Sequence, residues 1–179
     1  MINVLGCGKD GCVIDSFEWE DFSPKNGFVA KLLRQDIELD KKLHEILHNI
    51  DPNGERYSLY YFSTKPCTVT GLVKNPENIY NLTSNYGFFS QVVFQKRLIS
   101  LEPKRMTTIQ YRYLRRSLEI LHENGICHGD LPGNVMMDPN DGMPRIIDWE
   151  NAFYRKKGCF TYDILIDNSA FFTHFSVLK

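Results

Sequence analysis

The chain has 179 residues, of which 42% are hydrophobic and 24% are charged, and its formal net charge is −1. This near-neutral balance predicts neither a nucleic acid nor an anionic membrane as a partner. No apolar run approaches the roughly 20 residues of a membrane helix, and the N-terminus does not resemble a signal peptide. We therefore expect one domain, or one compact domain of two lobes, in an intracellular, cytoplasmic setting.

The five cysteines stand at positions 7, 12, 67, 127 and 159. Their number is odd, and they show no CxxC spacing. In an intracellular protein this pattern is typical of free thiols, so we expect a reducing compartment.

Short apolar runs separated by turn residues dominate the first half of the chain. They predict strands at 2–5, 12–17, 27–33, 57–63 and 91–98. Apolar residues at near-helical spacing predict a helix from 36 to about 50, where an Asp-Pro-Asn-Gly turn follows. The stretch 65–87, with Pro, Gly and four Asn, is expected to be an irregular insert.

The second half is richer in helical patterns. An apolar stripe predicts a helix over about 107–124, which Gly125 would end. Two apolar runs at 134–137 and 145–147 flank a turn and predict a hairpin, and the apolar tail 162–175 predicts a last helix. A sheet-rich first half and a helix-rich second half predict an α+β fold.

A glycine-rich turn follows the first predicted strand. Gly6, Gly8 and Gly11, with Val13, form the pattern G-x-G-x-x-G-x-V. Glycine lets the backbone approach nucleotide phosphates closely, where a side chain would block them. Taken alone, the same pattern also fits an ordinary glycine hairpin.

Lys31 ends the run Val29-Ala30-Lys31 in the third predicted strand. A lysine at this place is commonly a solvated charge at a strand end. Here it follows Gly11 by 20 residues, where a lysine could reach the α- and β-phosphates of a nucleotide and pair with a helix carboxylate.

Two acidic motifs complete the pattern. His128-Gly129-Asp130-Leu131-Pro132-Gly133-Asn134 follows a predicted helix, and Ile147-Asp148-Trp149-Glu150 follows the hairpin. Phosphoryl transfer needs one carboxylate to orient the attacking hydroxyl and others to hold Mg²⁺. Each motif alone could be a turn or a helix cap, but their order along the chain favours the catalytic interpretation.

In this order the four motifs resemble those of the protein-kinase superfamily in the wide sense. The His-Gly-Asp-Leu motif with its Pro-Gly-Asn resembles the small-molecule and atypical branch, which includes aminoglycoside phosphotransferases, choline kinases and ABC1-type kinases. The Ile-Asp-Trp-Glu motif resembles aminoglycoside phosphotransferases in particular, and the compact chain faintly resembles small kinases of large DNA viruses. The resemblance covers about 4–166. It implies a two-lobed fold with an antiparallel-sheet N-lobe at about 1–98, a hinge at about 96–103 and a truncated helical C-lobe at about 104–179.

The resemblance also implies a role for each motif residue, with ATP and Mg²⁺ as cofactors. Asp130 would be the catalytic base, and Asn134 and Asp148 would bind Mg²⁺. The expected nucleotide-binding residues are Gly6, Gly8, Gly11, Val13, Ala30 and Lys31, with Glu38 or Glu45 as the partner of Lys31. Glu38 is slightly favoured for that pairing.

The chain departs from the family pattern in three places. The step from Asp130 to Asn134 is one residue shorter, near the position where Ser/Thr protein kinases carry a lysine that contacts the γ-phosphate. Gly129 replaces an arginine, so control by activation-loop phosphorylation is not expected. Only 29 residues follow Glu150, and 162–164 is expected to begin the helix that anchors the catalytic loop.

Several functions are compatible with these motifs. A minimal Ser/Thr protein kinase with a protein substrate or partner is favoured, and a pseudokinase scaffold and a small-molecule kinase remain alternatives. His44-Glu45-Ile46-Leu47-His48 also matches the zinc-peptidase pattern HExxH, without a convincing third ligand on a later helix. The short C-lobe would be completed by a partner or a homodimer, in the host cytoplasm or a virion for a viral protein.

Overall fold

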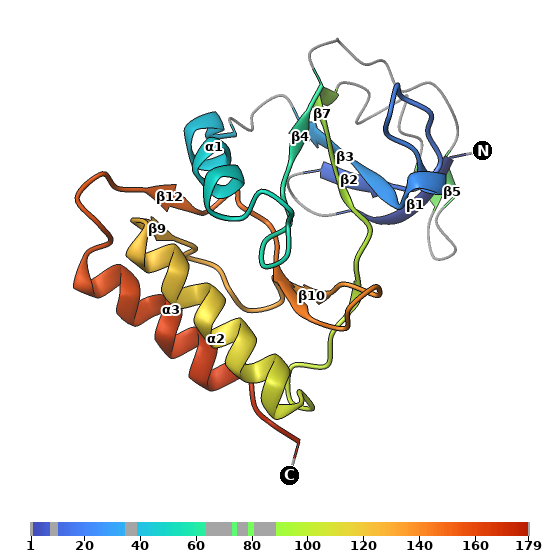
Figure 1. Ribbon diagram of the computed structural model, residues 1–179. Coiled ribbons are helices and arrows are strands. Elements are labelled where there is room, and N and C mark those ends of the chain that lie inside the picture. Colours follow the sequence, from blue (N-terminus) through green and yellow to red (C-terminus); the bar gives the residue numbers. More distant parts are fainter. Residues whose placement is uncertain are drawn as a thin grey trace. The chain divides into compact units, whose positions relative to one another are not determined.

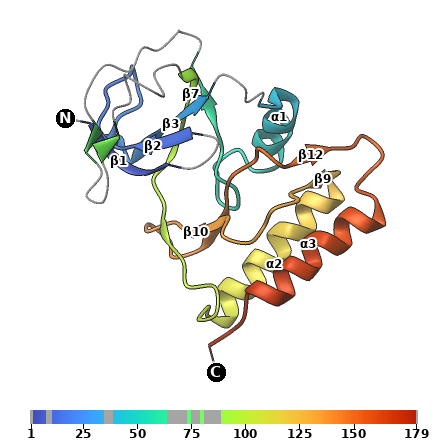
Figure 2. The ribbon, with the colours of Figure 1, turned by 180° about the vertical axis from the view of Figure 1, so that it is seen from behind.

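The computed structural model describes residues 2–7, 11–34, 39–63, 73–74, 79–80 and 89–178. The chain divides into two compact units, one of 1–38 with 60–97 and the other of 39–59 with 98–179. Figure 1 and Figure 2 show their elements from two sides. Within the described ranges, no helix is long and apolar enough to cross a membrane. The sequence-based lobe boundary at about 98 stays a prediction.

The first unit is built on a sheet of seven strands in the order β4-β7-β3-β2-β1-β5-β6. Neighbouring strands run antiparallel except β1 and β5, which are parallel. The strands are β1 (Ile2–Cys7), β2 (Gly11–Ile14), β3 (Phe28–Arg34), β4 (Tyr61–Phe62), β5 (Val73–Lys74), β6 (Ile79–Tyr80) and β7 (Phe89–Lys96), and the short helix η1 is Pro24–Asn26. β5 and β6 lie within the stretch that was expected to be irregular.

One face of this sheet holds the core of the first unit. Because side chains alternate between the two faces of a strand, Ala30 and Leu32 of β3 point to the same side. They are buried together with Ile14 and Phe94. Aromatic side chains cover this core, and Phe22 stacks on Phe94 with ring centroids 4.5 Å apart.

The second unit contains three helices and two small sheets in the described part of the chain. The helices are α1 (Lys41–Ile50), α2 (Thr108–Glu123) and α3 (Thr161–His174). The strands are β8 (Ile99–Ser100), β9 (Ile126–Cys127), β10 (Val135–Met137), β11 (Pro144–Ile146) and β12 (Phe153–Tyr154), ordered β11-β10-β8 and β12-β9. The predicted hairpin is the β10–β11 pair.

Helices α2 and α3 lie side by side and run antiparallel, as both views show (Figures 1 and 2). The segment before α2 meets the end of α3, where the Lys104 ammonium donates to the carbonyl of Thr173. Near the end of α2, His122 bonds to Asp167 of α3. Leu114, Leu118 and other residues of α2 are fully buried, as their apolar stripe predicts.

Side-chain caps fix the helix ends. Asp40 accepts hydrogen bonds from two backbone amides in the first turn of α1, and Thr107 forms a reciprocal capping box with Gln110 in α2. The Asp51 carboxylate accepts the backbone N–H groups of three residues, the last of which is Tyr57. The predicted strand at 57–63 is therefore reduced to β4, because Tyr57 turns toward Asp51 and bridges to Ile146 instead.

Two disulfides contradict the expectation of free thiols. Cys7 and Cys12 are direct partners across β1 and β2, with Cα atoms 4.1 Å apart. Cys127 of β9 and Cys159 lie 32 residues apart in sequence, yet their Cα atoms are 6.1 Å apart. The prediction was wrong for these four cysteines because folding, and not sequence spacing, brings each pair together. Cys67 lies outside the described residues.

Candidate active site

His128 begins the candidate catalytic loop directly after β9, and its side chain is fully buried. Its Nε2 lies 2.8 Å from the carbonyl oxygen of Ile147, and its Nδ1 accepts the backbone N–H of Asp130 at 3.3 Å. These two bonds fit the neutral imidazole with its proton on Nε2. Burial lowers the pKa of His128, although the bond to Ile147 opposes this shift. The neutral imidazole therefore links the loop that contains Asp130 to the loop that contains Ile147 through hydrogen bonds.

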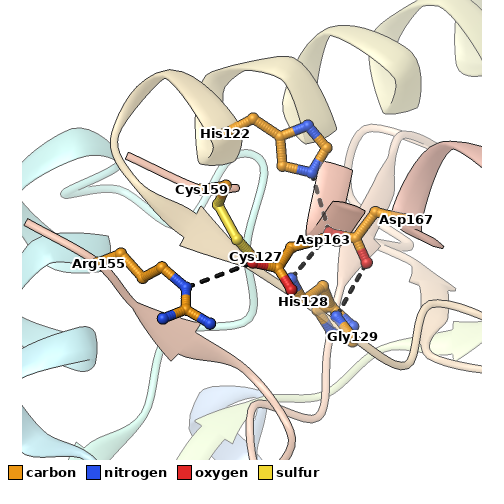
Figure 3. The surroundings of a disulfide bond; sticks show 8 residues. All are labelled: His122, Cys127, His128, Gly129, Arg155, Cys159, Asp163 and Asp167. Carbon is orange, nitrogen blue, oxygen red and sulfur yellow. Dashed lines mark hydrogen bonds and ion pairs between the residues drawn. A yellow bond between two sulfur atoms is a disulfide. The ribbon is translucent and has the colours of Figure 1, made fainter. Parts of the chain in front are cut away.

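Asp167 of α3 holds the backbone of this loop (Figure 3). Its Oδ2 accepts the N–H of His128 at 2.9 Å, and its Oδ1 accepts the N–H of Gly129 at 2.9 Å. His122 Nε2 lies 2.9 Å from Oδ2. Burial alone would raise the pKa of Asp167, but these hydrogen bonds lower it overall. Three hydrogen-bond donors thus stabilise the charged form of this carboxylate.

The loop-anchoring residue was not identified from the sequence. The motif at 162–164 was expected to begin the anchoring helix, and α3 does begin there. However, Asp163 pairs with Arg155 at 3.3 Å, and Asp167, one turn later, anchors the loop. A signal was present, because an acid inside an apolar helix needs partners when it is buried.

Asn134 closes the short loop that begins at Asp130. Its side-chain Nδ2 donates to the backbone oxygen of Asp130 at 2.7 Å. Its backbone oxygen accepts the N–H of Ile147 at 3.0 Å. The turn contains Gly133 at φ 78°, a left-handed conformation that suits glycine. Asn134 thus links the loop to Ile147, the residue before Asp148, although the loop has one residue fewer than the kinase pattern.

Asp148 adopts a left-handed backbone with φ 66°, which is uncommon for a residue other than glycine. Such conformations persist where their surroundings fix them, often at functional sites. Its neighbour Trp149 is buried and donates its indole N–H to the carbonyl of Ser58 at 2.8 Å. The indole also meets the His128 ring at a centroid distance of 5.2 Å. Trp149 therefore fixes the backbone on one side of Asp148.

Asn151 is a further residue that the sequence did not single out. Its side-chain Nδ2 donates to Oδ2 of Asp130 at 3.3 Å. It belongs to a turn closed by the N–H of Ala152 on the carbonyl of Trp149 at 3.1 Å. The second unit thus brings Asp130, Asn134 and the backbone of Asp148 together.

Lys31 belongs to β3 of the first unit, between Val13 and Val93 of the flanking strands. Its Nζ donates to the hydroxyl of Tyr60 at 3.1 Å and lies 5.6 Å from the centre of that ring. The neighbouring Ala30 is buried. Tyr60 was missed as a partner of Lys31, although the aromatic run around it was visible in the sequence.

The glycines of the first motif differ in what they allow. In the described part of the chain, a Cβ at Gly6 would meet nothing within 4 Å. A Cβ at Gly11 would lie 2.0 Å from the backbone oxygen of Leu32. Gly11 is therefore required by the close approach of β2 and β3, whatever else it does. Gly8 lies outside the described residues.

Of the two carboxylates proposed to pair with Lys31, the structure describes one, Glu45. Glu38 lies outside the described residues. Glu45 is exposed on α1 and pairs with Lys42 at 3.2 Å.

In the HExxH pattern, His44 is buried and His48 is partly buried. No group of three His, Cys, Asp or Glu side chains within the described ranges is arranged to hold a metal ion.

The chain was compared with known proteins, and the sequence relatives it matches are kinases. No protein-family model matches the chain. It is 26% identical over 155 residues to protein kinase gsk3 of Schizosaccharomyces pombe, covering 83% of this chain and 37% of that protein. It is 25% identical over 157 residues to glycogen synthase kinase 1 of Pyricularia oryzae, covering 83% and 36%. The chain thus spans about a third of the length of these curated relatives.

A solved structure shares the fold. The kinase PK-1 of Cydia pomonella granulovirus superposes with a TM-score of 0.50 at 13% identity, covering 86% of this chain and 52% of that one. This likeness shows a protein-kinase-like fold, and the weak sequence similarity to two kinases agrees with it. The prediction of an α+β, kinase-like fold with an antiparallel sheet is confirmed.

Proposed function

We propose that the chain is an ATP- and Mg²⁺-dependent phosphotransferase, specifically a minimal Ser/Thr protein kinase. The observation that carries the proposal is the bond from Asn134 Nδ2 to the backbone oxygen of Asp130, at 2.7 Å. It closes the shortened loop and leaves the candidate base and a candidate metal ligand in one bonded network. The network continues to Ile147, directly before Asp148.

The residues of the second unit fit the roles that phosphoryl transfer requires. Mg²⁺ prefers oxygen ligands, and the carboxylate of Asp148 and the amide oxygen of Asn134 are of this kind. Because the amide nitrogen of Asn134 is engaged by Asp130, its oxygen is the end that would serve the metal. Asp130 would orient the acceptor hydroxyl, and Mg-ATP supplies the phosphoryl group.

In the first unit, Lys31 would contact the α- and β-phosphates, since it stands on β3, an interior strand of the sheet between β7 and β2. Gly6, without steric neighbours in the described residues, would allow the backbone to approach the nucleotide. A protein hydroxyl is the favoured acceptor, because both curated relatives are named as protein or glycogen synthase kinases. A small-molecule hydroxyl is the alternative acceptor.

A pseudokinase scaffold is the second candidate function. It is favoured by the loop from Asp130 to Asn134, which contains Leu, Pro and Gly and therefore has no cation for the γ-phosphate. Retention of Lys31, Asp130, Asn134 and Asp148 in one chain weighs against it.

Transfer of labelled γ-phosphate from ATP with Mg²⁺ tests the proposal. Acceptors are the protein itself, a generic protein mixture and a panel of small alcohols. We expect transfer by the wild type and by Asp21→Asn, an exposed control in the first unit, and none by Asp148→Asn. Equal transfer by Asp148→Asn would contradict the assignment. ATP-induced thermal stabilisation without transfer by any form would establish the pseudokinase instead.

A further inference from the structure

Asp130 is held at three different atoms within the second unit. Its backbone N–H donates to His128 Nδ1 at 3.3 Å, and its backbone oxygen accepts from Asn134 Nδ2 at 2.7 Å. Its carboxylate Oδ2 accepts from Asn151 Nδ2 at 3.3 Å. The first two contacts fix the backbone of Asp130. The contact with Asn151 reaches the carboxylate itself.

The surrounding structure fixes the position of Asn151 on both sides. Trp149, two residues earlier, is buried and bonded to the carbonyl of Ser58. Phe153, two residues later, pairs with Cys127 in the β9–β12 sheet. The backbone oxygen of Asn151 also lies against Gly129, 3.2 Å from the place of a Cβ there. A Cβ at residue 129 would therefore require this segment to move away by a few tenths of an ångström.

We propose that Asn151 is a positioning residue for the carboxylate of Asp130. This inference rests on the proposed phosphotransferase function. The three residues between Asp130 and Asn134 are Leu, Pro and Gly, none of which has a side-chain N–H donor. Asn151 supplies such a donor from the other motif loop. By engaging Oδ2, it directs Oδ1 of the carboxylate toward the acceptor hydroxyl.

Chemistry supports a neutral amide in this place. The amide donates to the carboxylate and restricts its rotation without placing a second charge beside it. A base with one oxygen held and one oxygen presented is better oriented than a freely rotating carboxylate, and orientation is a large part of catalysis in phosphoryl transfer. We therefore expect Asn151 to affect turnover more than nucleotide affinity.

A local turn role offers a competing explanation, because Asn is common in turns for its own backbone contacts. The substitution Asn151→Asp separates the two. Aspartate serves a turn equally well and has the same shape, but it places a carboxylate against that of Asp130. Asn151→Ala removes the donor without adding a charge, and Asn49→Ala is the matched control because Asn49 is exposed on α1.

The measured quantities are kcat, the KM for ATP and the thermal midpoint of each variant. We expect Asn151→Ala to lower kcat about 10-fold and Asn151→Asp to lower it about 100-fold, with the KM for ATP changed less than about 2-fold. The thermal midpoint of Asn151→Asp should fall only slightly below that of the wild type, since the residue is exposed and solvent screens the added charge. A kcat for Asn151→Asp equal to that of the wild type or of Asn151→Ala would overturn the inference.

A second measurement does not depend on activity. The side-chain amide resonance of Asn151, assigned in a ¹H–¹⁵N spectrum by its loss in Asn151→Asp, should shift when Asp130→Ala removes the acceptor. An unchanged resonance would overturn the inference. If the wild-type protein transfers no phosphate, the proposed function fails, and this resonance alone decides whether Asn151 engages Asp130.

Discussion

Asp167 accepts a hydrogen bond from the backbone N–H of His128 at 2.9 Å, although 39 positions separate the two residues. The same carboxylate accepts the N–H of Gly129, so one side chain of α3 sets two successive peptide groups of the candidate catalytic loop. A single helix therefore positions the loop that carries Asp130. This relationship gives α3 a direct structural connection to the candidate site.

Asp167→Asn should destabilise the protein. The amide keeps the shape of the carboxylate but points an N–H₂ group at one of its three present donors, and it removes the charge that strengthens the other bonds. We expect the free energy of unfolding, measured in urea, to fall by about 2–4 kcal/mol. The control is Asp163→Asn on the same helix, whose partner Arg155 is partly exposed and which should cost less than about 1 kcal/mol. Equal losses in the two variants would contradict the anchoring role.

The disulfides predict a thiol count. Four of the five cysteines are paired, so we expect one thiol to react with a thiol reagent in denaturant without reductant. Because Cys127 and Cys159 close a long loop, Cys127→Ser should lower the free energy of unfolding by about 3–4 kcal/mol under oxidising conditions. The control variant is Cys67→Ser. Five reactive thiols in freshly purified, unreduced protein would show that the pairs do not form.

Gly125 and Gly133 provide a matched test of close backbone packing. Both have a left-handed backbone, with φ 74° and 78°. A Cβ at Gly125 would lie 2.3 Å from the backbone oxygen of Arg155, whereas one at Gly133 would meet nothing within 4 Å in the described part of the chain. We expect Gly133→Ala to lower the free energy of unfolding by about 1 kcal/mol and Gly125→Ala by roughly 3 kcal/mol or more. Similar losses of unfolding free energy in the two variants would mean that the backbone at Arg155 moves away from the added Cβ at little cost.

His128 predicts how stability depends on pH. Since burial lowers its pKa in the folded protein below the ordinary value of 6.5, the unfolded chain takes up a proton first as the pH falls. Stability is therefore fully present above about pH 6.5 and decreases below it, by at most about 1.4 kcal/mol per pH unit for one proton. Urea unfolding between pH 7.5 and 5.5 measures this slope.

The variant His128→Gln cannot titrate and should show a shallower slope, even if its absolute stability is lower. His174→Gln, which changes an exposed histidine at the end of α3, should keep the slope of the wild type. At lower pH a second decline is expected. The pKa of Asp167 is lowered below its ordinary value of 3.8, so its contribution is lost as the pH falls through the folded-state value. A slope unchanged in His128→Gln would contradict the assignment to His128.

Sequence reasoning located the elements well where the pattern was long or the punctuation strong. The helix predicted at 107–124 is α2, with Thr107 as its cap and Gly125 beyond its end. The hairpin predicted at 134–147 is present as β10 and β11. The strand predicted at 57–63 was too long, because Asp51 binds the Tyr57 backbone, a contact that local propensity does not encode.

Local order along the chain was enough to indicate a kinase-like fold and to propose Asp130, Asn134 and Asp148 as site residues, because glycine turns, strand ends and acidic loops follow one another in a characteristic sequence. The contacts of Asp167 and Asn151 with the candidate catalytic loop and the pairing of Cys127 with Cys159 were decided only by the tertiary structure. Each depends on a contact between residues more than 20 positions apart. Such contacts are set by how helices and loops pack, which residue spacing alone does not specify.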